Sequence, residues 1–153
     1  MTRSNKDILL LSAVPLLTGI LIYLLFRDER TVVFSWLERL QLMGVLSEVR
    51  SLTLPVAPLL PEWLLFNLPN GLWSFSYALI IVFIWYREQG NLQFLFFLTV
   101  PALGLGYELM QYMGVIGGTF CLLDLGFCFA GIIAGAAAGL FLKEKKRCHH
   151  AKN

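Results

Sequence analysis

The sequence predicts an all-α membrane protein with four transmembrane helices and an extra interfacial amphipathic helix between the first and second. Two observations support this fold class. Hydrophobic residues make up 58% of the chain and charged residues only 14%, whereas a soluble domain is about 45–50% apolar and about 25% charged. The apolar residues also gather in long runs with few charges. A water-soluble domain of this size can bury only a limited fraction of its surface when it folds. We therefore expect the excess apolar surface to be covered by lipid.

Four apolar runs are long enough to cross a bilayer, and they place residues 1–153 in a single membrane domain. The first run covers residues 8–26 and would span ~28 Å as a helix. A polar stretch, Arg27 to Arg30, follows it in place of a small-residue cleavage site, so we expect an uncleaved anchor and not a signal peptide. The other runs cover residues 70–86, 92–113 and 120–142.

The external segment, residues 31–66, has a different character from the spans. Its first part alternates apolar and charged residues at helical spacing, which makes it amphipathic and too charged to span. We expect a helix that lies in the membrane interface, although the segment dipping into the bilayer is the competing interpretation. Three prolines, Pro55, Pro58 and Pro61, predict an extended stretch before an apolar anchor at residues 63–66.

The distribution of Lys and Arg predicts the orientation, because cytoplasmic loops carry an excess of these residues. With both termini inside, eight basic residues are cytoplasmic: Arg3, Lys6, Arg87, Lys143, Lys145, Lys146, Arg147 and Lys152. Only four are outside: Arg27, Arg30, Arg39 and Arg50. The sequence therefore predicts cytoplasmic termini and an external 31–66 segment.

Glycines recur every four residues in the fourth span, at Gly131, Gly135 and Gly139. Small residues at this spacing let another helix approach closely. Packing inside the monomer is the favoured interpretation. A homodimer or larger membrane complex through the same face is the alternative.

Two carboxylates lie inside predicted spans. Glu108 and Asp124 are ~9 Å and ~6 Å from the outer ends of the third and fourth spans. An ionised group in the bilayer costs several kcal/mol unless it finds a partner or water, so we expect the two acids to share one outward-facing polar site. Gln111 falls one turn after Glu108 and is expected on the same face. Asn70, Trp73, Ser74 and Tyr77 of the second span are expected to complete the site.

The same acids allow three roles. They could bind the polar or cationic head group of a lipid, or act as general acid and base, since two neighbouring carboxylates raise one pKa. They could instead be structural, hydrogen-bonding the bundle together or pairing with Arg27 or Arg50. No metal-ligand spacing, cofactor motif or nucleophile–base pair is recognisable, so an enzyme is the less favoured role. A basic stripe of the kind that binds nucleic acid is absent from the sequence too.

The stretch from Glu108 to Gly131 resembles the VanZ-like family of small bacterial membrane proteins. The resemblance rests on a Glu-x-x-Gln pair (Glu108, Gln111), a Gly-Thr-Phe turn that contains Thr119, and the aspartate Asp124 with Gly131 seven residues later. Cys128 stands where the family has asparagine, and the family's first conserved block is not matched. The resemblance implies a bacterial inner-membrane protein associated with the cell envelope. We therefore expect membrane lipids and a lipid-linked or envelope-precursor ligand as partners.

Overall fold

Every element of the described chain is helical. The computed structural model describes residues 3–29, 32–86, 90–115 and 120–150. The elements are α1 (Arg3–Phe26), α2 (Val32–Arg39), α3 (Met43–Thr53), the 3₁₀ helix η1 (Leu54–Leu59), α4 (Glu62–Phe66), α5 (Leu68–Trp85), α6 (Asn91–Gly104), α7 (Gly106–Tyr112) and α8 (Leu122–His150).

Three helices of the described chain are long and apolar enough to cross a membrane. They contain the stretches Asp7–Phe26, Leu68–Trp85 and Leu122–Lys145. The pair α6 and α7 passes the same test together but is bent by 44°, so it forms either a broken fourth span or a re-entrant loop. These stretches lie close to the four predicted runs, and they are consistent with a multi-pass membrane protein.

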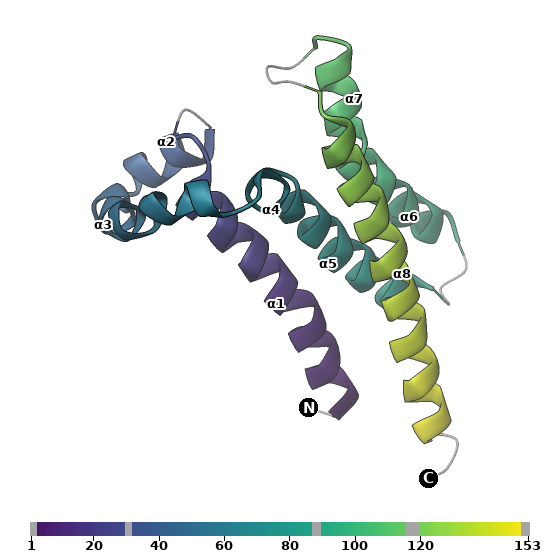
Figure 1. The fold of residues 1–153 in the computed structure, drawn as a ribbon. Helices are drawn as coiled ribbons and strands as arrows, with labels where there is room; N and C mark the ends of the chain where they lie inside the picture. The colour runs from purple at the N-terminus through teal and green to yellow at the C-terminus, as the bar shows by residue number, and fades with distance from the viewer. Residues whose placement is uncertain (1–2, 30–31, 87–89, 116–119, 151–153) are drawn as a thin grey trace.

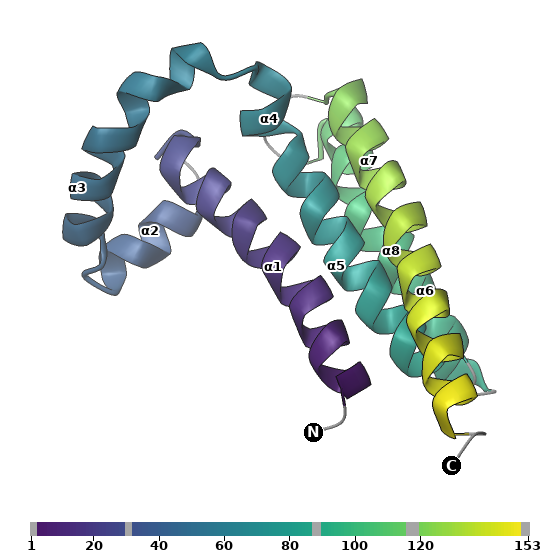
Figure 2. The same ribbon diagram turned by 60° about the horizontal axis from the view of Figure 1, so that its bottom comes forward.

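The long helices run alternately up and down. In Figures 1 and 2, α1 runs away from the N-terminus, α5 returns, the α6–α7 pair runs up again, and α8 descends to the C-terminus. Both chain ends therefore lie at one end of the bundle, and α4, α7 and the start of α8 lie at the other (Figure 1). Below, these are called the terminal end and the distal end.

Helix α5 is the centre of the bundle and packs against α1, α6 and α8. Its residues Ala78 and Ile81 are buried, and Val100 of α6 completes the small apolar core with them. The Trp85 ring stacks on the Phe96 ring with 4.4 Å between centroids, which joins the lower part of α5 to α6. Much of the surface of α1 and α6 is left apolar and exposed, as expected of helices that face lipid.

The glycine face of α8 lies directly on the backbone of α5. A Cβ atom at Gly131 or Gly135 would collide with the carbonyl oxygen of Gly71 or Phe75. A Cβ atom at Gly139 would lie 2.8 Å from the Leu79 carbonyl oxygen. The three glycines therefore serve packing within the chain. A dimer through this face would require α8 to separate from α5.

The third predicted run is not one continuous helix. It divides at Leu105 into α6 and α7, between Gly104 and Gly106. Pro101 removes one helical hydrogen-bond donor, and the two glycines favour bending because they lack side chains that restrict the backbone. Gly104 also lies against Ser74 of α5. A Cβ atom at position 104 would lie 3.2 Å from the Ser74 Oγ, so a larger residue there would force Ser74 to shift.

The prediction of an extended stretch at Pro55, Pro58 and Pro61 is wrong for its first part. Residues Leu54–Leu59 form η1, with one proline near its start and one inside it. The fixed proline φ suits a 3₁₀ helix as well as an extended chain, and so short an element loses few hydrogen bonds. The chain is extended only at Leu60 and Pro61, where ψ is 143° and 141°.

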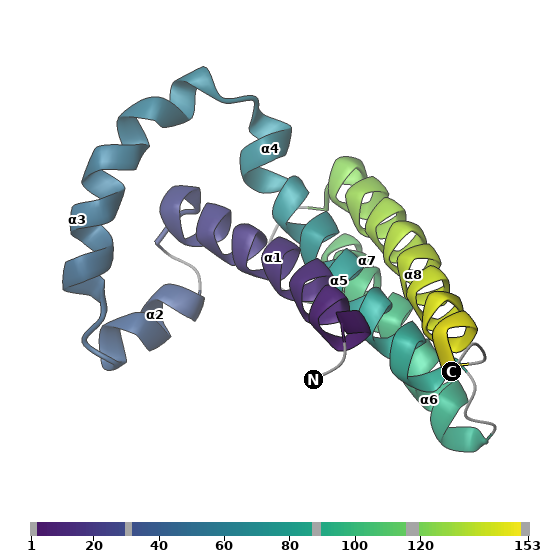
Figure 3. The ribbon, with the colours of Figure 1, turned by 90° about the horizontal axis from the view of Figure 1, so that it is seen from below.

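Helices α2, α3 and η1 form an arch beside the distal end of α1, as Figures 2 and 3 show. Within the arch, α3 and η1 contact α1, while α2 contacts α3. The arch stands on the opposite side of α1 from α7 and α8 (Figure 3). It therefore covers the end of α1 and not the region around Glu108 and Asp124.

Candidate functional site

Asp124 lies in the first turn of α8 and is only 8% exposed. Its Oδ1 accepts two hydrogen bonds of 2.9 Å, one from the side-chain amide of Asn67 and one from that of Asn70. Both asparagines come from the start of α5, where Asn67 is the residue before the helix. A carboxylate in the first turn of a helix is also stabilised by the helix dipole.

Glu108 approaches Asp124 from the neighbouring helix α7 and is 4% exposed. Its Oε2 accepts a hydrogen bond of 3.3 Å from the backbone N–H of Cys121. The carbonyl of Cys121 in turn accepts the N–H of Leu125, so Cys121 begins the hydrogen-bond pattern of α8. Glu108 therefore satisfies one of the N–H groups that a helix start leaves without an intrahelical partner.

The two acids form an acidic cluster with Asn67, Asn70 and the Cys121 backbone at the distal end of the bundle. Both carboxylates lie at the start of α8, because Asp124 is in its first turn and Glu108 accepts the N–H of Cys121, three residues earlier. In the described part of the chain, neither acid forms an ion pair with Arg or Lys. The cluster is therefore rich in hydrogen-bond acceptors and lacks a bonded cation. Groups of three metal-ligating residues are not found among the described residues either.

The cluster continues one helical turn deeper with a thiol and a hydroxyl. Cys128 follows Asp124 by four residues on α8 and is buried. Ser74 of α5 is buried near this thiol. Buried polar groups of α5 and α8 thus extend from Asn67 down to Ser74.

The arginines that could have neutralised the acids have other partners. Arg50 is 5% exposed and donates to the carbonyl oxygens of Leu24, at 2.6 Å, and Arg27, at 3.0 Å. Its Nε also lies 3.1 Å from a carboxylate oxygen of Glu29. The Arg27 guanidinium lies over the ring of Phe66, 5.6 Å from its centroid. Arg50 therefore binds the C-terminal end of α1 and does not pair with either acid.

The other predicted site residues do not bond to the two acids in the described structure. The Trp73 indole packs against Gly19 of α1 and lies 5.4 Å from the Tyr23 ring, centroid to centroid, so it faces α1. The Tyr77 hydroxyl bonds to Thr99 of α6 at 2.6 Å. Gln111 lies half-buried on α7, and no hydrogen bond joins its side chain to the acids among the described residues. Thr119 lies outside the described residues.

Asn67 is the residue that sequence reasoning missed. It is 6% exposed and bonds Asp124 directly, and its amide also lies 3.6 Å from the Cys121 sulfur. Two asparagines three residues apart at the start of an apolar span were the available signal, because residues at that spacing share a helix face. Pro69 between them obscured it by suggesting that the helix starts later.

No family model, curated protein or solved structure matches this chain.

Proposed function

We propose that this chain is a small multi-pass membrane protein whose acidic cluster binds the amine-bearing head group of a lipid or a lipid-linked cell-envelope precursor. The observation that carries the proposal is the pair of buried acids, Glu108 and Asp124, which lack a cationic partner among the described residues. Acidic groups in a membrane are costly without compensation, and they mark functional sites by default. An ammonium group would supply the missing charge and donate hydrogen bonds to both acids.

The proposal places the cluster at the outer surface of a bacterial inner membrane. It takes α6 and α7 as one broken span, which gives four spans in all, and it takes the Lys and Arg distribution as the orientation signal. With cytoplasmic termini, the distal end of the bundle faces outward. The VanZ-like resemblance of residues 108–131 points to the same compartment and to envelope ligands.

Helix starts support a binding role for this end of the bundle. Asp124 is the third residue of α8, and Glu108 is the third residue of α7. Each acid is held by donors from a different segment, so the two carboxylates are fixed before any ligand arrives. A site whose polar groups are already ordered loses less conformational entropy on binding, which favours affinity.

A structural role is the competing interpretation, because the same hydrogen bonds also join helices. Asp124 ties α8 to the start of α5 through Asn67 and Asn70, and Glu108 caps the start of α8. These bonds alone would justify two acids at a helix junction. The two interpretations predict different effects of neutral substitutions at Glu108 and Asp124. If the acids are structural, the substitutions lower stability, and if the acids bind a ligand, the substitutions weaken binding.

The test uses purified protein in mild detergent, with native mass spectrometry to record bound lipid. The probes are phosphatidylethanolamine, which carries a primary amine, and phosphatidylglycerol, which does not. We expect Glu108→Gln and Asp124→Asn to reduce retention of phosphatidylethanolamine at least tenfold, with little effect on phosphatidylglycerol. Glu62→Gln, at an exposed acid of α4, is the matched control and should bind like the unmodified chain.

The outcome that contradicts the proposal is equal retention of both lipids by all variants whose helical content is intact. A loss of thermal stability in the Glu108 and Asp124 variants without a change in lipid preference would establish the structural role instead. The same spectra report the oligomeric state, so a subunit role in a larger homomeric assembly would also be visible.

A further inference from the structure

Helix α3 divides its surface into three distinct sides. Arg50 is buried and faces α1. The exposed apolar residues Val45, Val49 and Leu52 recur at spacings of four and three, so they share one side. Ser47, Glu48 and Ser51 are also exposed and fall on the remaining side. The helix is therefore amphipathic, and its apolar side has no partner in the described structure.

Exposed apolar side chains occur on all three elements of the arch. Val45 is 69% exposed and Leu52 is 78% exposed on α3, while Leu59 of η1 is 82% exposed. Trp36 of α2 and Leu40, just beyond the end of α2, are exposed as well. In water each square ångström of such surface costs about 25 cal/mol, and contiguous patches of this kind mark interaction sites.

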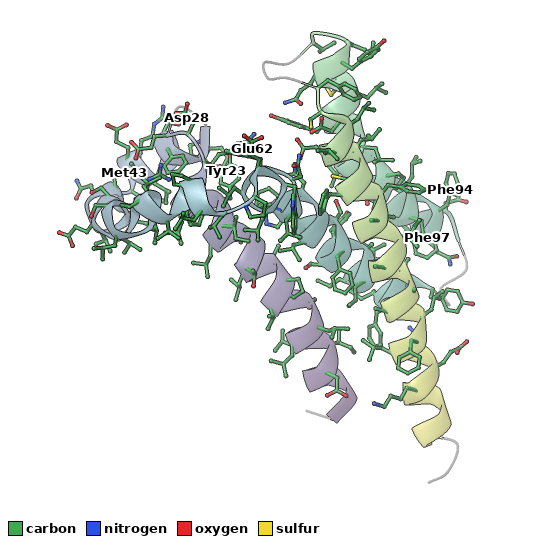
Figure 4. All side chains as sticks on the ribbon, viewed as in Figure 1. Tyr23, Asp28, Met43, Glu62, Phe94 and Phe97 are labelled. Carbon is green, nitrogen blue, oxygen red and sulfur yellow. The ribbon has the colours of Figure 1, made fainter. Side chains whose placement is uncertain are left out.

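The path of the chain fixes where this surface lies. The membrane stretch of α1 ends at Phe26, and that of α5 begins at Leu68. Both of these ends are at the distal end of the bundle, so the arch must leave and re-enter the bilayer at the same face (Figures 1 and 2). The arch is therefore held near the membrane surface at the distal end, in contact with α1 through α3 and η1. The labelled acids Asp28 and Glu62 lie on the side away from the chain termini (Figure 4).

Arg50 fixes the arch to the membrane span. Its bonds to the Leu24 and Arg27 carbonyls use acceptors that the end of α1 leaves unpaired, and a cation is favoured there by the helix dipole. Phe34 of α2 is buried beneath the guanidinium, and its ring centroid lies 5.0 Å from the Cζ of Arg50. One side chain thus joins α1, α2 and α3, which sets the height and rotation of the arch.

The charges of the arch and its flanks do not suit an anionic surface. From Arg27 to Glu62 the sequence has five acids, Asp28, Glu29, Glu38, Glu48 and Glu62. It has four arginines, Arg27, Arg30, Arg39 and Arg50, so the segment has a net charge of −1. Interfacial helices that bind anionic lipids usually carry Lys and Arg on the polar face, and an acidic excess is repelled by such lipids.

We propose that the α2–α3–η1 arch is a lipid-binding surface that inserts its apolar side into one leaflet, fits zwitterionic lipid, and is held in place by Arg50. The occupant is the bilayer itself, and the proposal does not depend on head-group binding by the acidic cluster. Insertion is driven by apolar burial alone, so adding anionic lipid should not deepen it. Arg50 is a positioning residue, because it acts through the C-terminal end of α1.

The test measures the depth of spin labels by electron paramagnetic resonance in phosphatidylcholine nanodiscs. Single labels are placed at Val45→Cys and Ser47→Cys in full-length protein whose native cysteines are replaced by alanine. Two residues turn the helix by about 200°, so the two labels point to opposite sides of α3. We expect the ratio of oxygen to nickel-chelate accessibility to be at least threefold higher at position 45 than at position 47.

The matched variants separate anchoring from insertion. Arg50→Gln should make the label at position 45 more mobile and bring the two ratios together, whereas Arg39→Gln, at an exposed arginine of α2, should change neither. Circular dichroism of each variant checks that the helices persist. Replacing a third of the lipid with phosphatidylglycerol should leave the ratio at position 45 unchanged.

Three results would overturn the proposal. Water-like accessibility at both positions would show that the apolar side is not in lipid. Spin–spin broadening at position 45 would show that a second copy covers this side. Deeper insertion with phosphatidylglycerol would show that the arch seeks anionic lipid. None of these measurements reports on Glu108 or Asp124, so the head-group proposal stands or falls separately.

Discussion

The side-chain amide of Asn67 donates a hydrogen bond of 2.9 Å to Oδ1 of Asp124, across 57 residues of sequence. This bond joins the residue before α5 to the first turn of α8 at the distal end of the bundle. It lies at the same end as the carboxylate of Glu108, which accepts the Cys121 N–H. The position of the acidic cluster is thus set by contacts between segments and not by any single helix.

Removing the Asn67 amide should weaken the junction between α5 and α8. We expect a double-mutant cycle of Asn67→Leu and Asp124→Leu to give a coupling free energy of about 0.6–1.7 kcal/mol, the range found for hydrogen bonds within membranes. Equilibrium unfolding in mixed detergent micelles, followed by circular dichroism, measures it. Strict additivity of the two single changes would show that the 2.9 Å contact contributes nothing to stability.

Enlarging Gly135 should separate α8 from α5. The new Cβ of Gly135→Ala would meet the Phe75 carbonyl, which belongs to a helix backbone and cannot move aside cheaply. We expect a loss of about 1–3 kcal/mol, typical of overpacking, in the same unfolding assay.

Gly126→Ala is the control for that substitution, because nothing lies within 4 Å of its Cβ position. Alanine is a better helix former than glycine, so this change should be neutral or stabilising by up to about 1 kcal/mol. Equal effects of the two substitutions would contradict close backbone packing at Gly135.

The Tyr77 hydroxyl should contribute to the contact between α5 and α6. Thr99 donates to the Phe96 carbonyl at 2.6 Å, which leaves its oxygen to accept from Tyr77. Tyr77→Phe should cost about 0.6 kcal/mol, and no more than about 1.7, in unfolding measurements. Tyr107→Phe, at a tyrosine that is 57% exposed, should cost nothing measurable.

Lys143 should stabilise the terminal end of α5. Its Nζ donates to the Phe83 carbonyl at 2.8 Å and lies over the Phe83 ring, 5.3 Å from the centroid. A cation at the end of a helix also interacts well with the helix dipole. Lys143→Met should lose about 0.5–1.5 kcal/mol. The control is Lys145→Met, at an exposed lysine two residues further along α8. It should leave the unfolding midpoint unchanged.

The membrane-spanning stretches could be predicted from the sequence because length and hydropathy are local properties. The position of the break at Leu105 was harder to predict, because Pro101 and the two glycines permit a bend at several positions. Packing of Gly104 against Ser74 favours one of these positions. Of the site, the two acids were predicted to lie together, and hydrogen bonds to adjacent segments place them at one end of the bundle. Trp73 and Tyr77 were not placed correctly near the acids, because α5 is surrounded by other helices and each residue faces a different neighbour.

Residue type and spacing alone indicate a membrane protein, the number of its long apolar stretches, and the charged residues inside them. The bonding partner of each polar group follows only from the way the helices pack together. Arg50 binds backbone carbonyls of α1, and a sequence cannot reveal that partner because every residue has a carbonyl. The glycine face could have met another chain or this one, and only the approach of α5 assigned it to packing within the chain.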